Sequence, residues 1–109
     1  KSMHSEAAKH LIPRAERLAR ELKLAPKGFV IGRGKRKLGH CTSTGVIQLS
    51  HNLMFLPNEL VDYIIYHELA HLTEMNHSDK FHALCNKYCK GREHEYKNQL
   101  RNHTWCILR

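Results

Sequence analysis

The segment His67-Glu68-Leu69-Ala70-His71 constrains the fold of this chain more than any other stretch. An α-helix turns by about 100° per residue, so histidines four positions apart project from one face, a single turn apart. Their ring nitrogens can then bind one Zn²⁺ at roughly 2.0–2.1 Å. Glu68 would lie beside this metal, where its carboxylate can deprotonate a zinc-bound water. The segment therefore predicts a helix that carries a zinc site and a general base.

The surrounding residues predict that this helix is largely buried. Pro57 is followed by Asn58 and Glu59, which form a reasonable helix start with acidic charge in the first turn. The expected helix spans residues 58–74, and apolar residues recur along it at three-to-four spacing: Leu60, Val61, Ile64, Ile65, Leu69 and Leu72. Buried imidazole nitrogens need partners, and a zinc ion would supply one for each ring.

The candidate for a third ligand is His77. If the helix continued straight, His77 would lie about 15 Å along the axis from His67, which is out of reach. A reversal near residues 75–76 would bring it back, and Asn76 is one of the few non-glycine residues that tolerates a left-handed turn. Ser78 can then cap a following helix. We therefore predict His77 as the third ligand; the alternative is an ordinary turn residue.

The segments around the motif follow a characteristic order. Leu38-Gly39-His40-Cys41-Thr42-Ser43 precedes it, and Asn76-His77-Ser78 and Phe81 follow it. Over roughly residues 11–100, and most specifically over 57–81, the chain resembles the YgjP-like zinc metallopeptidases, relatives of the SprT, WLM and minigluzincin-type zincins. The resemblance implies zinc bound by His67, His71 and His77, Glu68 as the general base, and a polypeptide substrate.

The chain also departs from this family's pattern. Leu38 and His40 stand where the family has Trp and Ser, and His82 replaces the Trp that usually follows the Phe of position 81. None of these positions is a predicted ligand. The departures therefore concern the surface that faces the substrate.

The order of predicted elements indicates an α+β fold. Helices are expected over residues 6–23 (kinked or restarted at Pro13), 58–74, 78–90 and 93–102, and strands over 29–32, 40–42 and 46–49, with a short helix or loop at 51–56. We predict one compact zincin-like domain over residues 1–109, with a small antiparallel three-stranded sheet against the zinc-binding helix. An edge strand within residues 41–49 would bind extended substrate by strand addition.

Four cysteines, Cys41, Cys85, Cys89 and Cys106, raise the question of a second metal site. Cys85 and Cys89, with His82 one turn earlier, could clip a metal, but structural zinc sites normally use tighter C-x₂-C spacing. Free cysteine is readily buried, so we expect buried thiols in a reducing compartment. The sequence has no stretch approaching about 18 apolar residues and no signal peptide at its start, which favours a cytoplasmic protein without membrane association.

The formal net charge of +8 indicates possible binding to an acidic partner. Two groups of basic residues carry much of it: Arg14, Arg17 and Arg20, and the run Arg33, Lys35, Arg36 and Lys37. They could bind phosphates of a nucleic acid, or simply form a solvated surface. The sequence shows no base-reading module, so such binding would be insensitive to base sequence. Neither group predicts an oligomeric state.

Several alternatives remain open at this point. The ligand spacing also fits a zinc hydrolase acting on or recruited to nucleic acid, either an SprT-like DNA-associated protease or an endoribonuclease, although Glu68 favours peptide hydrolysis. Glu93 or Glu95 could replace His77 as the third ligand, and the zinc could stabilise a non-catalytic binding domain. Candidates for stabilising an oxyanion are Tyr63, Tyr66, His82, Tyr88 and Tyr96.

Overall fold

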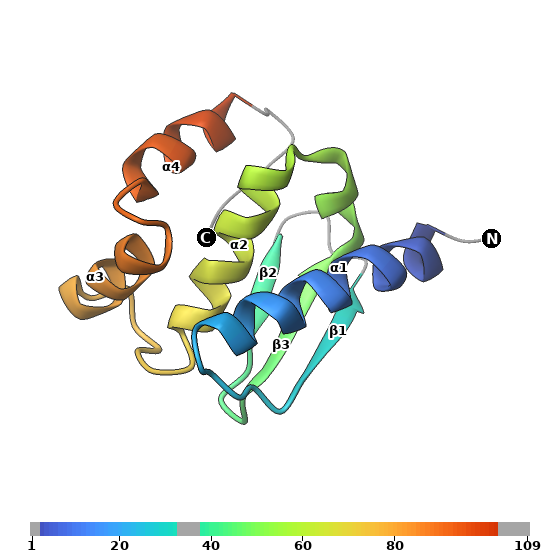
Figure 1. The fold of residues 1–109 in the computed structure, drawn as a ribbon, viewed down its shortest axis with the longest axis horizontal. Helices are drawn as coiled ribbons and strands as arrows, with labels where there is room; N and C mark the ends of the chain where they lie inside the picture. Colours follow the sequence, from blue (N-terminus) through green and yellow to red (C-terminus); the bar gives the residue numbers. More distant parts are fainter. Residues whose placement is uncertain (1–2, 33–37, 103–109) are drawn as a thin grey trace.

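The computed structural model describes residues 3–32 and 38–102 and confirms the α+β fold. Its elements in order are α1 (Met3–Glu21), β1 (Gly28–Gly32), β2 (Gly39–Cys41), β3 (Val46–Ser50), the 3₁₀ helix η1 (His51–Phe55), α2 (Asn58–Ala70), α3 (Asp79–Tyr88) and α4 (Glu93–Arg101). Figure 1 shows α2 at the centre, with α1 on one side and α3 and α4 on the other. The basic run at residues 33–37 and Cys106 lie outside the described residues.

The sheet is mixed, so the prediction of a purely antiparallel sheet was wrong. Its strand order is β1-β3-β2, in which β3 pairs parallel with β1 and antiparallel with β2. β3 lies between the other two strands. β1 therefore pairs with β3, which runs parallel to it, and not with β2, which follows β1 in the sequence. β3 carries Ile47 and Leu49, both fully buried, which suits the central position. β3 is central and β1 and β2 are the two edge strands, so within the predicted edge range, residues 41–49, only Cys41 belongs to an edge strand.

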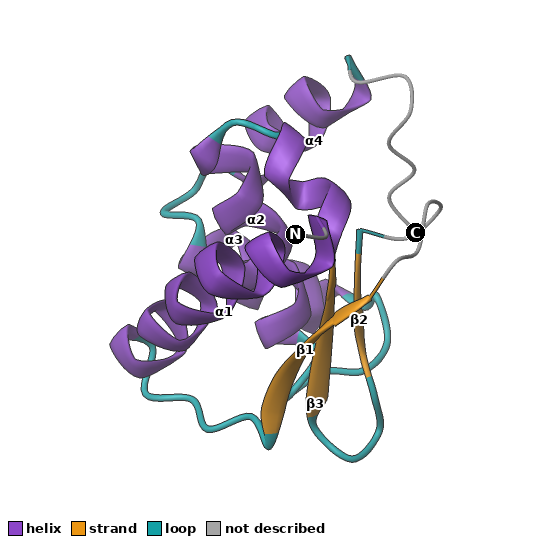
Figure 2. Cartoon of the chain, turned by 90° about the vertical axis from the view of Figure 1, so that its right-hand side faces the viewer, coloured by secondary structure: helices purple, strands orange, loops and turns teal. Residues whose placement is uncertain are grey.

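The helices cover one face of the sheet, as Figure 2 shows. Val30, Gln48 and His40 are paired across the three strands and are exposed on the open face. Ile47 and Leu49 point the other way, into the core. This alternation is typical of a sheet with one solvated face.

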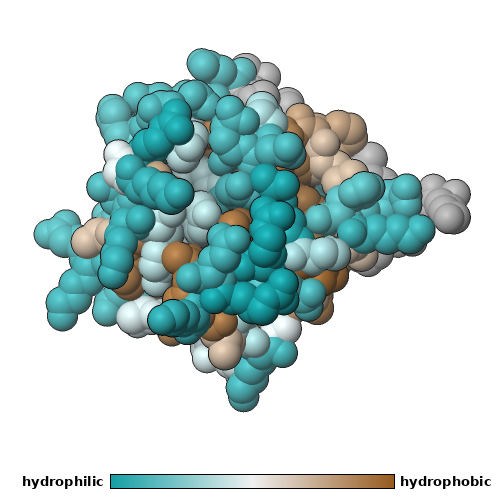
Figure 3. All heavy atoms as spheres, viewed as in Figure 1, coloured by the Kyte–Doolittle hydropathy of each residue, from teal (hydrophilic) through white to brown (hydrophobic). Residues whose placement is uncertain are grey.

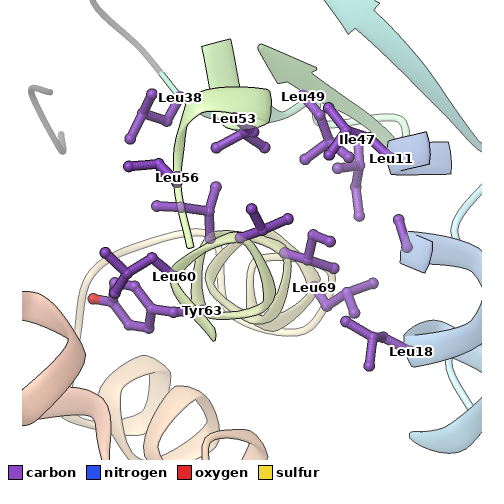
Figure 4. Close-up of a cluster of buried hydrophobic side chains, with 14 of the residues drawn as sticks. Leu11, Leu18, Leu38, Ile47, Leu49, Leu53, Leu56, Leu60, Tyr63 and Leu69 are labelled. Carbon is purple, nitrogen blue, oxygen red and sulfur yellow. The ribbon is translucent and has the colours of Figure 1, made fainter. Parts of the chain in front are cut away.

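The core forms around α2, which is buried on most of its surface. Figure 4 shows Leu69 on the side of α2 that faces the sheet and α1, and Leu60 on the other side of α2, beside Tyr63. Ile64, Ile65 and Leu69 are fully buried, and each such side chain contributes roughly 1.5–3 kcal/mol through removal of apolar surface from water. The prediction of a buried central helix is confirmed.

α1 continues through Pro13 as one helix. The prediction allowed either a kink or a restart at Pro13, and the helix does not restart there. Proline removes a backbone N–H donor and weakens a helix interior. Contacts on both sides of Pro13 offset this loss. Leu11 and Ala15 are buried in the core, and Arg14 forms a two-pronged ion pair with Asp62 of α2, with N···O distances of 2.5 and 3.0 Å.

The boundaries of the last two helices lie close to the predicted ones. α3 and α4 begin and end within two residues of the expected positions. After α3 the chain reverses at Lys90 and Gly91, both with positive φ, and the Gly91 N–H donates to the Asn86 carbonyl oxygen. Within residues 3–32 and 38–102, no helix combines the length and apolar character needed to cross a membrane.

The surface over α1 is largely hydrophilic. Figure 3, viewed as Figure 1, shows hydrophilic residues across much of this face, interrupted by small apolar areas. Two of the three arginines in the first basic group form ion pairs: Arg14 with Asp62, and Arg17 with Glu21 at 3.8 Å. These ion pairs reduce the positive charge that α1 presents to an acidic partner.

The Arg14–Asp62 pair is expected to stabilise the packing of α1 on α2. Its side chains are 27% and 23% exposed, and its geometry is bidentate. A double-mutant cycle with Arg14→Met and Asp62→Asn, measured by urea unfolding, should give a coupling of about 1 kcal/mol. The matched cycle at Arg17 and Glu21, which are 53% and 61% exposed, should give a coupling near zero. Equal couplings would contradict this assignment.

Candidate metal centre

The three predicted histidine ligands come together in one cluster. A potential ligand atom of His67, of His71 and of His77 all lie within 4.8 Å of one another. The ring centroids are 4.8–5.3 Å apart. In the part of the chain that the structure describes, this is the one group of three or more His, Cys, Asp or Glu side chains placed to hold a metal ion.

α2 delivers two of these imidazoles from one face. His67 is 4% exposed, and neither of its ring nitrogens has a hydrogen-bond partner. Buried nitrogens without partners are costly, and a metal ion would satisfy one of them. The His71 Nδ1 lies 3.0 Å from the Glu74 carbonyl oxygen, which places the proton on Nδ1 and leaves Nε2 for a metal.

The turn that brings His77 back differs from the prediction. α2 ends at Ala70 rather than at residue 74, and the next three N–H groups donate three residues back: His71 to Glu68, Leu72 to Leu69 and Thr73 to Ala70. The side chain of His71 then binds the Glu74 carbonyl. Asn76 does not adopt positive φ, so the expected left-handed residue was wrong. The tightened turn reverses the chain without one.

The start of α3 holds His77, the predicted third ligand, from the other side. The Ser78 hydroxyl accepts a hydrogen bond from the Phe81 N–H at 3.3 Å, which confirms the predicted cap. Phe81 is fully buried, and its ring lies 4.4–4.9 Å from the rings of His67, His71 and His77. His77 is exposed while the other two histidines are buried, so the cluster opens to solvent on its side. Three imidazoles with one open side are a donor set that fits zinc.

A cavity of about 220 Å³ lies beside the cluster. Its lining residues come from β2, α2 and the segment that follows α2: Gly39, His40, Cys41, Glu68, His71, Met75 and His77. Glu68 is 3% exposed and packs against β2 so closely that a Cβ at Gly39 would lie 2.8 Å from the Glu68 Cγ and 2.9 Å from its Oε2. The predicted carboxylate is thus at the cavity, between the cluster and the edge strand.

Burial sets the protonation of this centre. Desolvation, assisted by the neighbouring imidazoles of His71 and His77, lowers the pKa of His67 from 6.5 to about 3. Desolvation also lowers the pKa of His71. Both rings are therefore neutral near pH 7, which is the form that binds metal. Burial and the nearby Glu68 carboxylate raise the pKa of the Cys41 thiol.

The other predicted site residues are distributed elsewhere. Tyr66, Tyr88 and Tyr96 line a separate cavity, and Tyr63 is buried with its ring edge against His67. Of the five candidates for stabilising an oxyanion, His82 lies beside the exposed ligand, with its ring stacked on His77 at 6.3 Å.

The alternative third ligands have other partners. The Glu93 carboxylate lies 3.0 Å from the His82 Nδ1, and the Glu95 carboxylate pairs with Arg92. Cys85 and Cys89 are free, buried thiols, as is Cys41, and this part of the cysteine prediction is confirmed. Met75 also lines the cavity, but it was not predicted as a site residue, because nothing in the sequence pattern distinguishes it from an ordinary loop residue.

A buried helix that presents two histidines and a glutamate beside a small sheet is the arrangement of a metallopeptidase. A family model, the YgjP-like metallopeptidase domain, matches residues 1–103, and the chain belongs to this family. The fold is similar to the crystal structure of the metallopeptidase zymogen of Pyrococcus abyssi abylysin, with a TM-score of 0.76 and 22% identity over 91% of this chain and 99% of that one. No curated protein matches the chain.

Gly39 is expected to be required for the close packing of Glu68 against β2. In Gly39→Ala the new methyl group would overlap the Glu68 side chain, and such overpacking typically costs about 1–3 kcal/mol. Denaturant unfolding should show this loss. Gly28→Ala is the matched control, because a Cβ there meets no atom within 4 Å. A Gly39→Ala protein as stable as Gly28→Ala would show that Glu68 can move away freely.

The metal-free protein is expected to lose stability in acid because of His67. Its pKa is about 3 in the folded state and 6.5 as an ordinary histidine, so between these values the unfolded chain binds a proton that the folded one does not. Stability is therefore complete above about pH 6.5 and falls toward pH 3, by at most about 1.4 kcal/mol per pH unit from this group. Urea unfolding of chelator-treated protein at several pH values measures the slope. His67→Leu should flatten it, and an unchanged slope would refute the assignment.

Proposed function

We propose that this chain is a zinc-dependent metallopeptidase that hydrolyses peptide bonds, with Glu68 as the general base. The observation that carries this proposal is the convergence of His67, His71 and His77 in one cluster, two of which, His71 and His77, line a cavity together with Glu68. Membership of the YgjP-like metallopeptidase family supports it independently.

The chemistry divides between the metal and the protein. Zinc held by the three imidazoles would act as a Lewis acid and activate water near neutral pH. Glu68 would accept the proton of the attacking water and pass it to the leaving amine. His71 is oriented for metal binding by the Glu74 carbonyl, and Phe81 packs against all three rings. Zinc would stabilise the oxyanion of the tetrahedral intermediate, and a second stabilising group would come from the exposed side of the cluster, where His82 lies beside His77.

The edge strand offers a place for the substrate backbone. The Leu38 carbonyl accepts from the Ser50 N–H at 3.0 Å, and the Thr42 N–H donates to the Val46 carbonyl at 2.9 Å. Backbone groups alternate along an antiparallel strand, so those of Gly39 and Cys41 point away from β3. An extended polypeptide could pair with them as an additional strand. Both residues line the cavity, so the paired chain would pass over the metal centre.

A second candidate is a zinc hydrolase acting on or recruited to nucleic acid. The described part of the chain gives it less support than the sequence did, because Arg14 and Arg17 are paired with carboxylates. The side chains around the cavity also include no lysine or arginine that would bind phosphate, as far as the structure describes them. A third possibility, a zinc-stabilised binding domain, assigns no chemical role to Glu68.

Glu68→Gln should abolish hydrolysis while leaving zinc bound. Gln keeps the size of the side chain but cannot accept the proton, and loss of a general base typically costs about 10²–10⁴-fold in rate. The measurements are zinc content by elemental analysis and cleavage of an unfolded polypeptide. Glu59→Gln, an exposed position on the same helix, is the control and should change neither.

The outcomes separate the candidate functions. Hydrolysis retained in Glu68→Gln would remove the proposed general base. Zinc-loaded wild-type protein that cleaves structured RNA but not unfolded polypeptide would favour the nucleic-acid hydrolase. Stoichiometric zinc with neither activity, together with unfolding on chelation, would favour the binding domain.

A further inference from the structure

Met75 is an exposed methionine at the metal cavity. Its side chain is 51% exposed and lines the same cavity as Glu68, His71 and His77. Single exposed apolar residues are common on protein surfaces and need no explanation by themselves. The location of Met75 beside the cluster is therefore what gives it significance.

The backbone before Met75 is fixed to the metal centre. The Glu74 N–H donates to the Ala70 carbonyl oxygen at 3.0 Å, at the end of α2. The Glu74 carbonyl oxygen lies 3.0 Å from the His71 Nδ1. The backbone N–H and C=O groups of Glu74 are thus both hydrogen-bonded, the C=O group to the predicted ligand His71. Met75 follows directly, so its backbone is placed at a set position relative to His71.

The cavity offers few other contacts for a substrate side chain. Glu68 and the imidazoles of His71 and His77 are assigned to the chemistry. Gly39 has no side chain, and Cys41 is buried, with its sulfur 3.6 Å from the Thr42 carbonyl oxygen. The remaining lining residues are His40, which is exposed on the open face of the sheet, and Met75, whose side chain can touch the residue flanking the scissile bond. Of these two, only Met75 offers an apolar surface.

The size of the cavity fits one or two residues of a chain. Its volume of about 220 Å³ lies below the roughly 300–1,000 Å³ of small-molecule sites. A methionine side chain is flexible and polarizable, and adapts to apolar groups of different shapes. It gives a charged side chain no partner, and burial of an unpaired charge is unfavourable.

From these contacts we infer that Met75 makes the cleft selective for a large apolar side chain next to the scissile bond. This inference rests on the proposed peptidase function and names its substrate class: extended segments of unfolded polypeptide that expose apolar residues. Folded proteins bury most such residues, so they present few segments of this kind.

The test uses two peptides that differ only in having Leu or Glu beside the scissile bond. Wild-type, zinc-loaded protein should cleave the Leu peptide at least about tenfold faster in kcat/KM. Met75→Lys should reduce this ratio about tenfold or more, because its ammonium group would attract the Glu side chain. Met75→Leu should preserve the ratio within about threefold, since it keeps an apolar surface of similar size.

Met54→Lys is the matched control. Met54 is also an exposed methionine, at 38%, but it lines a different cavity, between α1 and η1. Its substitution adds the same charge and should leave the Leu-to-Glu ratio unchanged. An equal change in both lysine variants would overturn the inference, because the charge would then act at a distance. An unchanged ratio in Met75→Lys would also overturn it.

A binding measurement separates this inference from the proposed function. In zinc-loaded Glu68→Gln protein, labelled Leu and Glu peptides should differ in affinity by fluorescence anisotropy, and adding Met75→Lys should reduce the difference. If wild-type protein cleaves neither peptide but this difference in binding is present, the proposed function fails and the role of Met75 stands. If peptides are cleaved without discrimination, the function stands and the role of Met75 fails. Zinc content of each variant confirms that the metal centre is intact.

Discussion

The burial of polar groups on α2 is the constraint on which the rest of the structure depends. His67, Glu68 and His71 are at most 8% exposed, on a helix whose neighbouring residues form the core. Neither nitrogen of His67 has a hydrogen-bond partner. Such a group weakens a small domain unless a ligand satisfies it. The apolar packing of α2 against the sheet and α1 must therefore be strong enough to tolerate this cost, and a bound metal ion would offset it.

The hydrogen bond between His71 and the Glu74 carbonyl connects this helix to the open side of the centre. This hydrogen bond lies just after the end of α2. It orients the ring of His71 and holds the Glu74 carbonyl, which directly precedes Met75. Ser78 and the buried ring of Phe81 anchor the following helix. His77 thus lies on a short connection that is held at both ends. The same contacts that position a ligand also position the side chain that we infer to contact the substrate.

The sequence was sufficient for local features and for the identity of the cluster, because both depend on short-range rules. Helical spacing placed His67 and His71 on one face, and the Ser78 cap followed from its residue type. The strand order was not predictable in this way. Pairing of β1 with β3 depends on which strand occupies the centre, and the sequence shows only which strands follow one another. The prediction of a left-handed Asn76 was also wrong. The turn after α2 is formed instead with a contact between the His71 side chain and the Glu74 carbonyl, which the sequence pattern does not indicate.

The contact between Gly39 and Glu68 shows how the sheet contributes to chemistry at the cluster. A carboxylate on a helix surface has several rotamers, and its reactivity depends on which of them is populated. β2 passes so close to Glu68 that only a glycine fits, and the strand therefore limits where the carboxylate can lie. The backbone N–H and C=O groups of Gly39 and Cys41 in this strand point away from β3, toward an edge that none of the described strands covers. A polypeptide that pairs with this edge would then be positioned by β2, the same strand that limits the position of the Glu68 carboxylate, which we propose as the general base.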